Sequence, residues 1–176
     1  PLAFDENAAA QRLAAAVRLR TISFDGQSAA SAAEFRKLHA LLKKSFPRAH
    51  AVLKRETVNE LSLLYTWPGS DPAAKPIMLM AHQDVVPIAH GTERDWLADP
   101  FGGVIRDGFV WGRGAWDNKA NLFAIFEAIE TLAASGFKPR QTLYIAAGHD
   151  EEVGGEQGAK AIAALLQSRG VKLDFV

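Results

Sequence analysis

Three groups of polar residues in this sequence could carry out metal or acid–base chemistry. The first is His82 with Asp84, in the run Ala-His-Gln-Asp-Val-Val-Pro. The second is Asp117, which follows a glycine-containing segment, and the third is the pair Glu151 and Glu152. Imidazole nitrogens and carboxylate oxygens are ligands that zinc and similar divalent ions accept. The three groups therefore make a divalent metal site a candidate.

Each group alone also has a simpler explanation. His82 and Asp84 point to the same side of an extended backbone, so Asp84 could orient a metal-binding ring or merely pair with it. Asp117 could cap the helix that follows it. The acidic run 150–152 could be a solvated turn that a helix dipole stabilises, although packed carboxylates favour a bound cation. The occurrence of all three groups in one chain favours the metal site.

The remaining histidines are weaker candidates for metal binding. His39 is expected within a helix, and His50 and His90 in or beside loops, so we assign them structural or surface roles. His149 adjoins the acidic run and is a second candidate. The glycines at 112–114 are not followed by Gly-Lys-Ser/Thr, so this segment is not a phosphate-binding loop.

The elements that must position these groups can be read from the apolar pattern. Apolar residues at helical spacing predict helices at about 6–19, 31–45, 119–135 and 157–169. Shorter apolar runs predict strands at 50–54, 61–67, 77–81, 141–147 and 171–176, and Asp107-Gly108 predicts a hairpin at 104–111. The runs 77–81 and 141–147 are typical of strands buried on both faces. This order predicts an α/β three-layer sandwich with a mixed, mostly parallel sheet, whose strand ends carry the polar groups.

Composition excludes several classes of protein. The 20 Lys and Arg balance 20 Asp and Glu, which argues against nucleic acid or an anionic membrane as a partner. No apolar run approaches the ~18 residues that cross a bilayer, and no signal peptide is visible, so a cytoplasmic location is favoured. Without cysteine, neither a disulfide nor a thiolate metal site can form.

The polar groups and their surroundings resemble the M20 family of metallopeptidases, the clan of carboxypeptidase G2 and aminoacylase. The branch with Gly-X carboxypeptidases and N-fatty-acyl-amino-acid hydrolases is the most similar. The motifs that carry the resemblance are 81–87, Trp96 with 99–103, 107–115 with Asp117 and Lys119, and 150–155. Asn118 and Ala120 depart from the usual family residues. The likeness spans roughly residues 60–176, and the expected amino-terminal helices also fit it.

The resemblance implies a role for each residue of the candidate site. His82 would bind one metal ion, with Asp84 orienting its ring. Asp117 would bridge two zinc ions, and the peptide bond after Asp117 would be cis. Glu152 would bind the second ion. Glu151 would be the general base. Co²⁺ or Mn²⁺ could replace zinc.

The implied activity is zinc-dependent hydrolysis of an amide bond in a small peptide or an N-acyl amino acid, of the exopeptidase or aminoacylase type. One alternative is a biosynthetic deacylase of the acetylornithine or succinyl-diaminopimelate type. Another is a non-catalytic binding domain that retains the fold, although an intact Glu151 argues against it. The resemblance further implies that residues 1–176 form the amino-terminal part of a zinc-exopeptidase-like catalytic domain. A lid domain, which can mediate a homodimer, and two further ligands would then follow residue 176.

Overall fold

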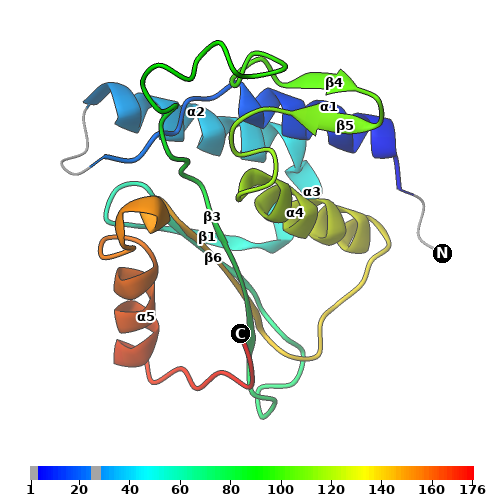
Figure 1. Cartoon of the computed structure of the whole chain (residues 1–176). Helices are drawn as coiled ribbons and strands as arrows, with labels where there is room; N and C mark the ends of the chain where they lie inside the picture. The colour runs from blue at the N-terminus through cyan, green and yellow to red at the C-terminus, as the bar shows by residue number, and fades with distance from the viewer. Residues whose placement is uncertain (1–3, 25–28) are drawn as a thin grey trace.

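The computed structural model describes residues 4–24 and 29–176, which form a four-stranded sheet between two helical layers (Figure 1). The helices are α1 (Glu6–Val17), α2 (Ala29–Ser45), α3 (Pro47–Val52), α4 (Lys119–Ala134) and α5 (Ala159–Ser168). The strands are β1 (Lys54–Val58), β2 (Ser62–Trp67), β3 (Ile77–His82), β4 (Val104–Arg106), β5 (Phe109–Trp111) and β6 (Leu143–Gly148). A 3-10 turn, η1 (Glu151–Val153), follows β6.

The sheet has the strand order β1-β2-β6-β3. β3 pairs with β6 in parallel, and the register places His82 opposite Gly148. β2 is antiparallel to both β1 and β6. The predicted α/β class and mixed sheet are confirmed. The expected predominance of parallel strands is not found among these four strands, because two of their three pairings are antiparallel.

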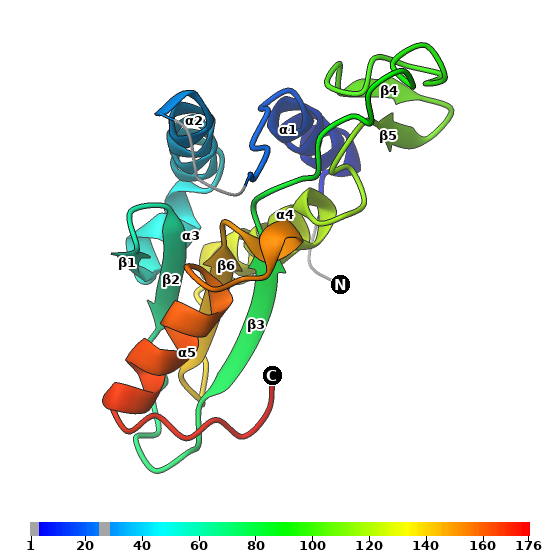
Figure 2. The same cartoon turned by 60° about the vertical axis from the view of Figure 1, so that its left-hand side comes forward.

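Apolar clusters on the two faces of the sheet make the predicted three layers (Figure 2). Because side chains alternate along a strand, β2 contributes to both clusters. The larger cluster packs α1 to α4 on one face and includes Leu63, Tyr65, Phe46, Leu122, Phe126 and Ile145. The smaller cluster packs α5 on the other face and consists of Leu64, Met78, Ala146, Ile162 and Leu166.

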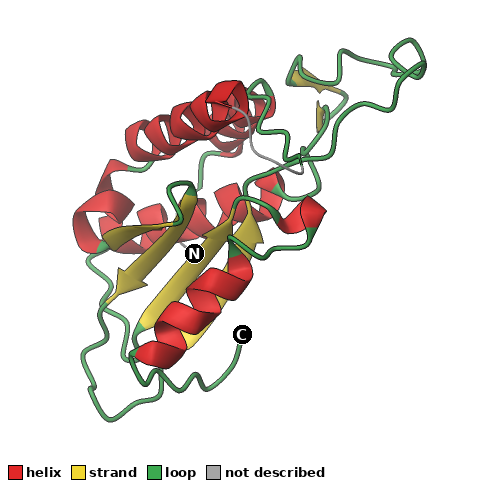
Figure 3. Cartoon of the chain, turned by 90° about the vertical axis from the view of Figure 1, so that its left-hand side faces the viewer, coloured by secondary structure: helices red, strands yellow, loops and turns green. Residues whose placement is uncertain are grey.

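The predicted helices and the hairpin are present, and the helix ends lie within about two residues of those expected. The hairpin β4–β5 lies apart from the main sheet (Figure 3). The strand expected at 50–54 is wrong: residues 47–52 form α3, and β1 begins at Lys54. Pro47 occupies the first turn of α3, where its fixed φ suits a helix and its missing N–H costs no hydrogen bond.

Two further expectations about strands are wrong. β3 is not buried on both faces, because it is at the edge of the described sheet and leaves Leu79 and Met80 37% and 44% exposed. The strand expected at 171–176 is not formed. That segment nevertheless runs beside β3, with the Asp174 amide donating to Pro76 O and the Met78 amide donating to Phe175 O.

No helix among residues 4–24 and 29–176 has the length and apolar content required to cross a membrane.

Replacing Phe126 with alanine should lower the free energy of unfolding by about 3–5 kcal/mol, because it opens a cavity in the larger cluster. Phe126 is fully buried, and its ring centroid lies 5.1 Å from that of Tyr65 and 5.4 Å from that of Phe46. Urea unfolding followed by circular dichroism measures the loss. The exposed Leu97, changed to alanine, is the control and should shift stability by less than about 0.5 kcal/mol. Equal losses in the two variants would contradict this core.

Candidate metal centre

The structure brings His82, Asp117 and Glu152 together. One ligand atom from each lies within 4.8 Å of the other two. His82 ends β3, Asp117 comes just before α4, and Glu152 lies in η1 after β6. Because β3 and β6 are parallel and in register, their carboxyl ends meet at one edge of the sheet, where α/β proteins bind ligands. Three segments distant in sequence thus converge.

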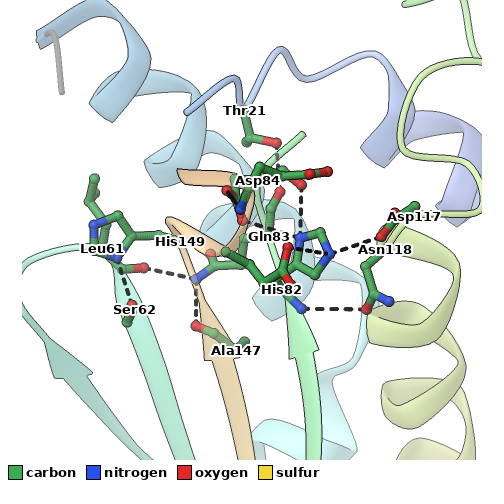
Figure 4. A network of polar contacts seen from close by, with 12 residues as sticks. Thr21, Leu61, Ser62, His82, Gln83, Asp84, Asp117, Asn118, Ala147 and His149 are labelled. Atoms are coloured by element: carbon green, nitrogen blue, oxygen red, sulfur yellow. Dashed lines mark hydrogen bonds and ion pairs between the residues drawn. The ribbon is translucent and has the colours of Figure 1, made fainter. Parts of the chain in front are cut away.

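The two ring nitrogens of His82 face different partners (Figure 4). Nδ1 lies 3.1 Å from the main-chain oxygen of Asp84 and 3.2 Å from its Oδ1. Nε2 lies 2.9 Å from Asp117 Oδ1 and 3.7 Å from Glu151 Oε2. A carboxylate on one nitrogen leaves the other free to bind a metal ion. The geometry therefore fits the orienting role predicted for Asp84.

Asp84 also connects His82 at the end of β3 with Glu152 in η1. Its carboxylate is fully buried, and its Oδ2 accepts a hydrogen bond of 3.0 Å from the Glu152 amide. Burial raises the pKa of Asp84, but the hydrogen bonds from His82 and from the Glu152 amide contribute to a net lowering. Asp84 is therefore a buried carboxylate that holds the His82 ring and the start of η1 in one arrangement.

Negative charge exceeds positive charge around His82. Burial lowers the pKa of this histidine, but Asp84, Asp117 and Glu151 raise it by more than burial lowers it. The net result is a pKa of about 9. Burial and the charge of Asp117 raise the pKa of Glu152. Carboxylates held close together repel each other, and a cation between them offsets that repulsion. One imidazole nitrogen with carboxylate oxygens is a donor set for zinc or a similar ion, so the residues fit such a metal.

The turn that carries Asp117 has the expected cis peptide bond, at Asp117–Asn118. Asn118, not Asp117, is the N-cap residue of α4, and its side chain makes no capping bond. The alternative of Asp117 as a simple helix cap is therefore wrong. Asn118 Oδ1 instead accepts a hydrogen bond of 3.4 Å from the His82 amide, which ties the turn to the end of β3.

Lys119 connects this turn to the end of α1. Its side chain is fully buried, and its Nζ donates to the main-chain oxygens of Ala16 and Leu19 at 3.0 and 2.6 Å. Burial lowers its pKa to about 7. Lys119 belongs to the motif that includes 107–115 and Asp117, but nothing in the sequence indicates its contact with the end of α1.

The other histidines lie outside the group of metal-ligand atoms found in the described residues. His90 is exposed, and His50 contacts Phe46 O and the Tyr65 hydroxyl, in agreement with surface and structural roles. His149, the second candidate, is buried, and its Nδ1 lies 2.6 Å from Ser62 Oγ. His39 contacts Gln83, a buried residue of the motif 81–87 to which the sequence pattern assigned no role.

Comparison with known proteins identifies the family. Residues 78–176, more than half of the chain, match the model of Peptidase family M20/M25/M40. The chain therefore belongs to this family, that of the M20 metallopeptidases. The resemblance seen in the sequence is confirmed.

Two curated relatives and two solved structures show how far the similarity extends. The chain is 46% identical over 170 residues to carboxypeptidase S of Saccharomyces cerevisiae and 42% identical over 168 residues to N-fatty-acyl-amino acid synthase/hydrolase PM20D1 of Mus musculus. These matches cover 93% and 94% of this chain but 30% and 33% of the relatives. The chain therefore spans about a third of their length.

The solved structures support the fold. Human carnosine dipeptidase 1 superposes with a TM-score of 0.69 at 22% identity, over 94% of this chain and 37% of that one. The M20 family metallo-carboxypeptidase of Sulfolobus solfataricus superposes with a TM-score of 0.72 at 20% identity, over 98% and 37%.

Metal binding at pH 7 should release about one proton from His82, because the ring must be neutral to bind and its pKa of about 9 keeps it protonated. Apparent affinity should rise with pH and level off above about 9. Calorimetric titration with Zn²⁺ in buffers of different ionisation enthalpy measures the released protons. Asp84→Asn removes a charge that raises this pKa, so the plateau should move to lower pH. A proton count near zero at pH 7 for the unaltered protein would contradict the prediction.

Proposed function

We propose that this chain is the amino-terminal part of the catalytic domain of an M20 enzyme that hydrolyses an amide bond in a peptide or an N-acyl amino acid. The observation that carries the proposal is the convergence of His82, Asp117 and Glu152 beside a further carboxylate, Glu151. The names of the relatives, a carboxypeptidase and an N-fatty-acyl-amino acid synthase/hydrolase, support this substrate class.

The proposed cofactor is a pair of zinc ions, with Co²⁺ or Mn²⁺ as substitutes. His82 would hold one ion and Glu152 the other, with Asp117 between them. Bound zinc would supply Lewis acidity, which polarises a carbonyl and makes water more acidic. Asp84 would keep the His82 ring in place and fix its Nδ1–H tautomer.

Glu151 is the proposed general base. Its side chain is 56% exposed, and its Oε2 lies 3.7 Å from His82 Nε2, so it is at the site and accessible to a substrate. An unliganded carboxylate here can accept the proton of the attacking water and later return it to the leaving amine. The geometry thus favours an enzyme over a binding domain that only retains the fold.

Among residues 4–24 and 29–176, the candidate group supplies two protein ligands to each proposed ion, with Asp117 counted for both. Catalytic zinc sites usually have three protein ligands. We therefore propose that further ligands, and a lid domain through which a homodimer can form, belong to a longer protein that contains this chain. That longer protein is called the full-length protein below.

A substrate panel tests the proposed function. Zinc-loaded full-length protein should hydrolyse N-acyl amino acids or dipeptides, and the loss of turnover after chelation should be reversed by added zinc. Selective turnover of acetylornithine or succinyl-diaminopimelate would instead support the biosynthetic deacylase. A zinc-loaded protein that turns over none of these compounds would support the non-catalytic alternative.

Glu151→Gln in the full-length protein should retain the metal ions but lower turnover by about 10²–10⁴-fold, because an amide cannot accept the proton. Steady-state kinetics and metal analysis measure the two effects. Glu156→Gln is the matched control, since Glu156 is an exposed acid that pairs with Lys160, and it should leave turnover unchanged. A near-normal kcat for Glu151→Gln would show that another group takes the proton.

The chain of residues 1–176 alone should hydrolyse none of these substrates and should bind zinc weakly. Because stabilisation by a ligand follows RT ln(1 + [L]/Kd), its unfolding temperature should rise only at high zinc concentration. Thermal unfolding over a zinc series measures this, with the His82→Ala chain as the control that should respond less. Tight binding of two zinc ions with turnover would contradict the ligand assignment, and His149 and Asp150 would then be the first residues to re-examine.

A further inference from the structure

In the sequence, Gln83 stands between His82 and Asp84, the residue whose carboxylate would orient the His82 ring. Side chains alternate along an extended backbone, so Gln83 points away from the metal centre while His82 and Asp84 face it (Figure 4). The residue is fully buried, at 0% exposure. Its main-chain oxygen accepts a hydrogen bond of 2.7 Å from the Thr21 hydroxyl. A long polar side chain is therefore enclosed directly behind the candidate site.

The amide of Gln83 joins the end of β3 to two neighbouring segments. Its Nε2 donates to Leu61 O, just before β2, at 2.9 Å and to Ala147 O, near the end of β6, at 2.8 Å. Its main-chain amide also donates to Gly148 O at 2.8 Å. The main chain that carries His82 is thus hydrogen-bonded to the end of β6, which leads into η1 and Glu152.

The remaining atom of the amide, Oε1, faces His39 in α2, whose Nε2 lies 2.7 Å away. Because Nε2 of Gln83 points at two carbonyl oxygens, Oε1 must be the acceptor, so His39 Nε2 carries the proton. Nδ1 of His39 is then the acceptor and faces an Arg55 guanidinium nitrogen at 3.4 Å. Every hydrogen-bonding atom of the Gln83 amide has a partner, and His39 has one defined tautomer.

We propose that Gln83 is a positioning residue for the metal centre, with His39 as the donor that holds it. The proposal rests on the metal site of the proposed function. By fastening the end of β3 to the end of β6, the amide fixes the separation of His82 from Glu152. A buried amide that only contributed to stability would not alter the metal ligands when replaced at a temperature where the protein stays folded.

The experiment uses full-length protein loaded with Co²⁺, whose visible absorption reports the geometry of its ligands. Gln83→Met keeps the length of the side chain and removes all three hydrogen bonds. We expect Co²⁺ affinity to fall by about 10–100-fold, as for other residues that orient metal ligands, and the absorption bands to change. Circular dichroism establishes that each variant is folded at the temperature used.

A pair of His39 variants repeats the test from the other side of the contact. His39→Leu removes the donor to Gln83 and should weaken Co²⁺ binding with the same spectral change. His39→Gln keeps an N–H donor and should restore both readouts toward those of the unaltered protein. Because these variants leave Gln83 in place, they decide the proposal even if Gln83→Met does not fold.

His50→Leu is the matched control. His50 is a second helical histidine with hydrogen bonds to Phe46 O and the Tyr65 hydroxyl, and its ring stacks on Phe126 in the larger cluster. Its loss should lower the unfolding temperature while leaving Co²⁺ affinity and spectrum unchanged.

Two outcomes would overturn the proposal, and they differ. If Gln83→Met and His39→Leu behave like His50→Leu, losing stability but keeping the Co²⁺ affinity and spectrum, Gln83 has no positioning role and the metal site stands. If His82→Ala binds Co²⁺ as tightly as the unaltered protein, the proposed metal site is itself wrong, and the positioning role falls with it.

Discussion

The parallel pairing of β3 with β6 is the constraint on which the candidate metal centre depends. The register that sets His82 opposite Gly148 brings the end of one strand next to the turn that carries Glu152. A slip of one residue would exchange the two faces of β3, turning Gln83 toward the carboxylates and His82 into the interior. The bonds from Gln83 to Ala147 O and Gly148 O oppose such a slip. The contacts that hold the strand register therefore also hold His82 in place relative to η1.

Solvent exposure divides the carboxylates around His82 into two kinds. Asp84 is buried behind His82, while Asp117 and Glu151 remain exposed in front of it, with side chains 68% and 56% accessible. A buried carboxylate fixes the ring, and the exposed ones stay available to a cation and to a substrate. The same residue type thus occupies a buried position and positions open to ligands, because its solvent access differs.

The sequence predicts the residues that converge better than it predicts their surroundings. His82, Asp117 and the pair 151–152 could be anticipated because each follows or precedes a clear apolar element, and the carboxyl ends of parallel strands meet. The choice of Glu152 within its pair comes from the resemblance to the M20 family. The apolar run of β3 reads the same in the centre of a sheet or at its edge, so the exposure of Leu79 and Met80 could not be anticipated.

Two other features, the short helix α3 and the contact of Gln83 with His39, could not be predicted from the sequence pattern. A six-residue helix such as α3 is shorter than the window over which helical spacing can be recognised, and the sequence pattern predicts its residues 50–52 as part of a strand. The contact of Gln83 with His39 joins residues 44 positions apart, and nothing local marks it. Burial of a single glutamine becomes visible only when the segments that surround it are placed in space.

The contact of Lys119 with the end of α1 has a consequence for how the centre is assembled. Lys119 Nζ bonds to carbonyls 103 and 100 residues earlier in the chain, so this contact joins two segments that are far apart in the sequence. The shape of the turn that carries Asp117 therefore depends on the position of the amino-terminal helix α1. Fraying of that helix, a local opening well below global unfolding in cost, would reach the metal centre although α1 contributes no ligand to it. The carboxyl end of α1 and the start of α4 are thus coupled through one side chain.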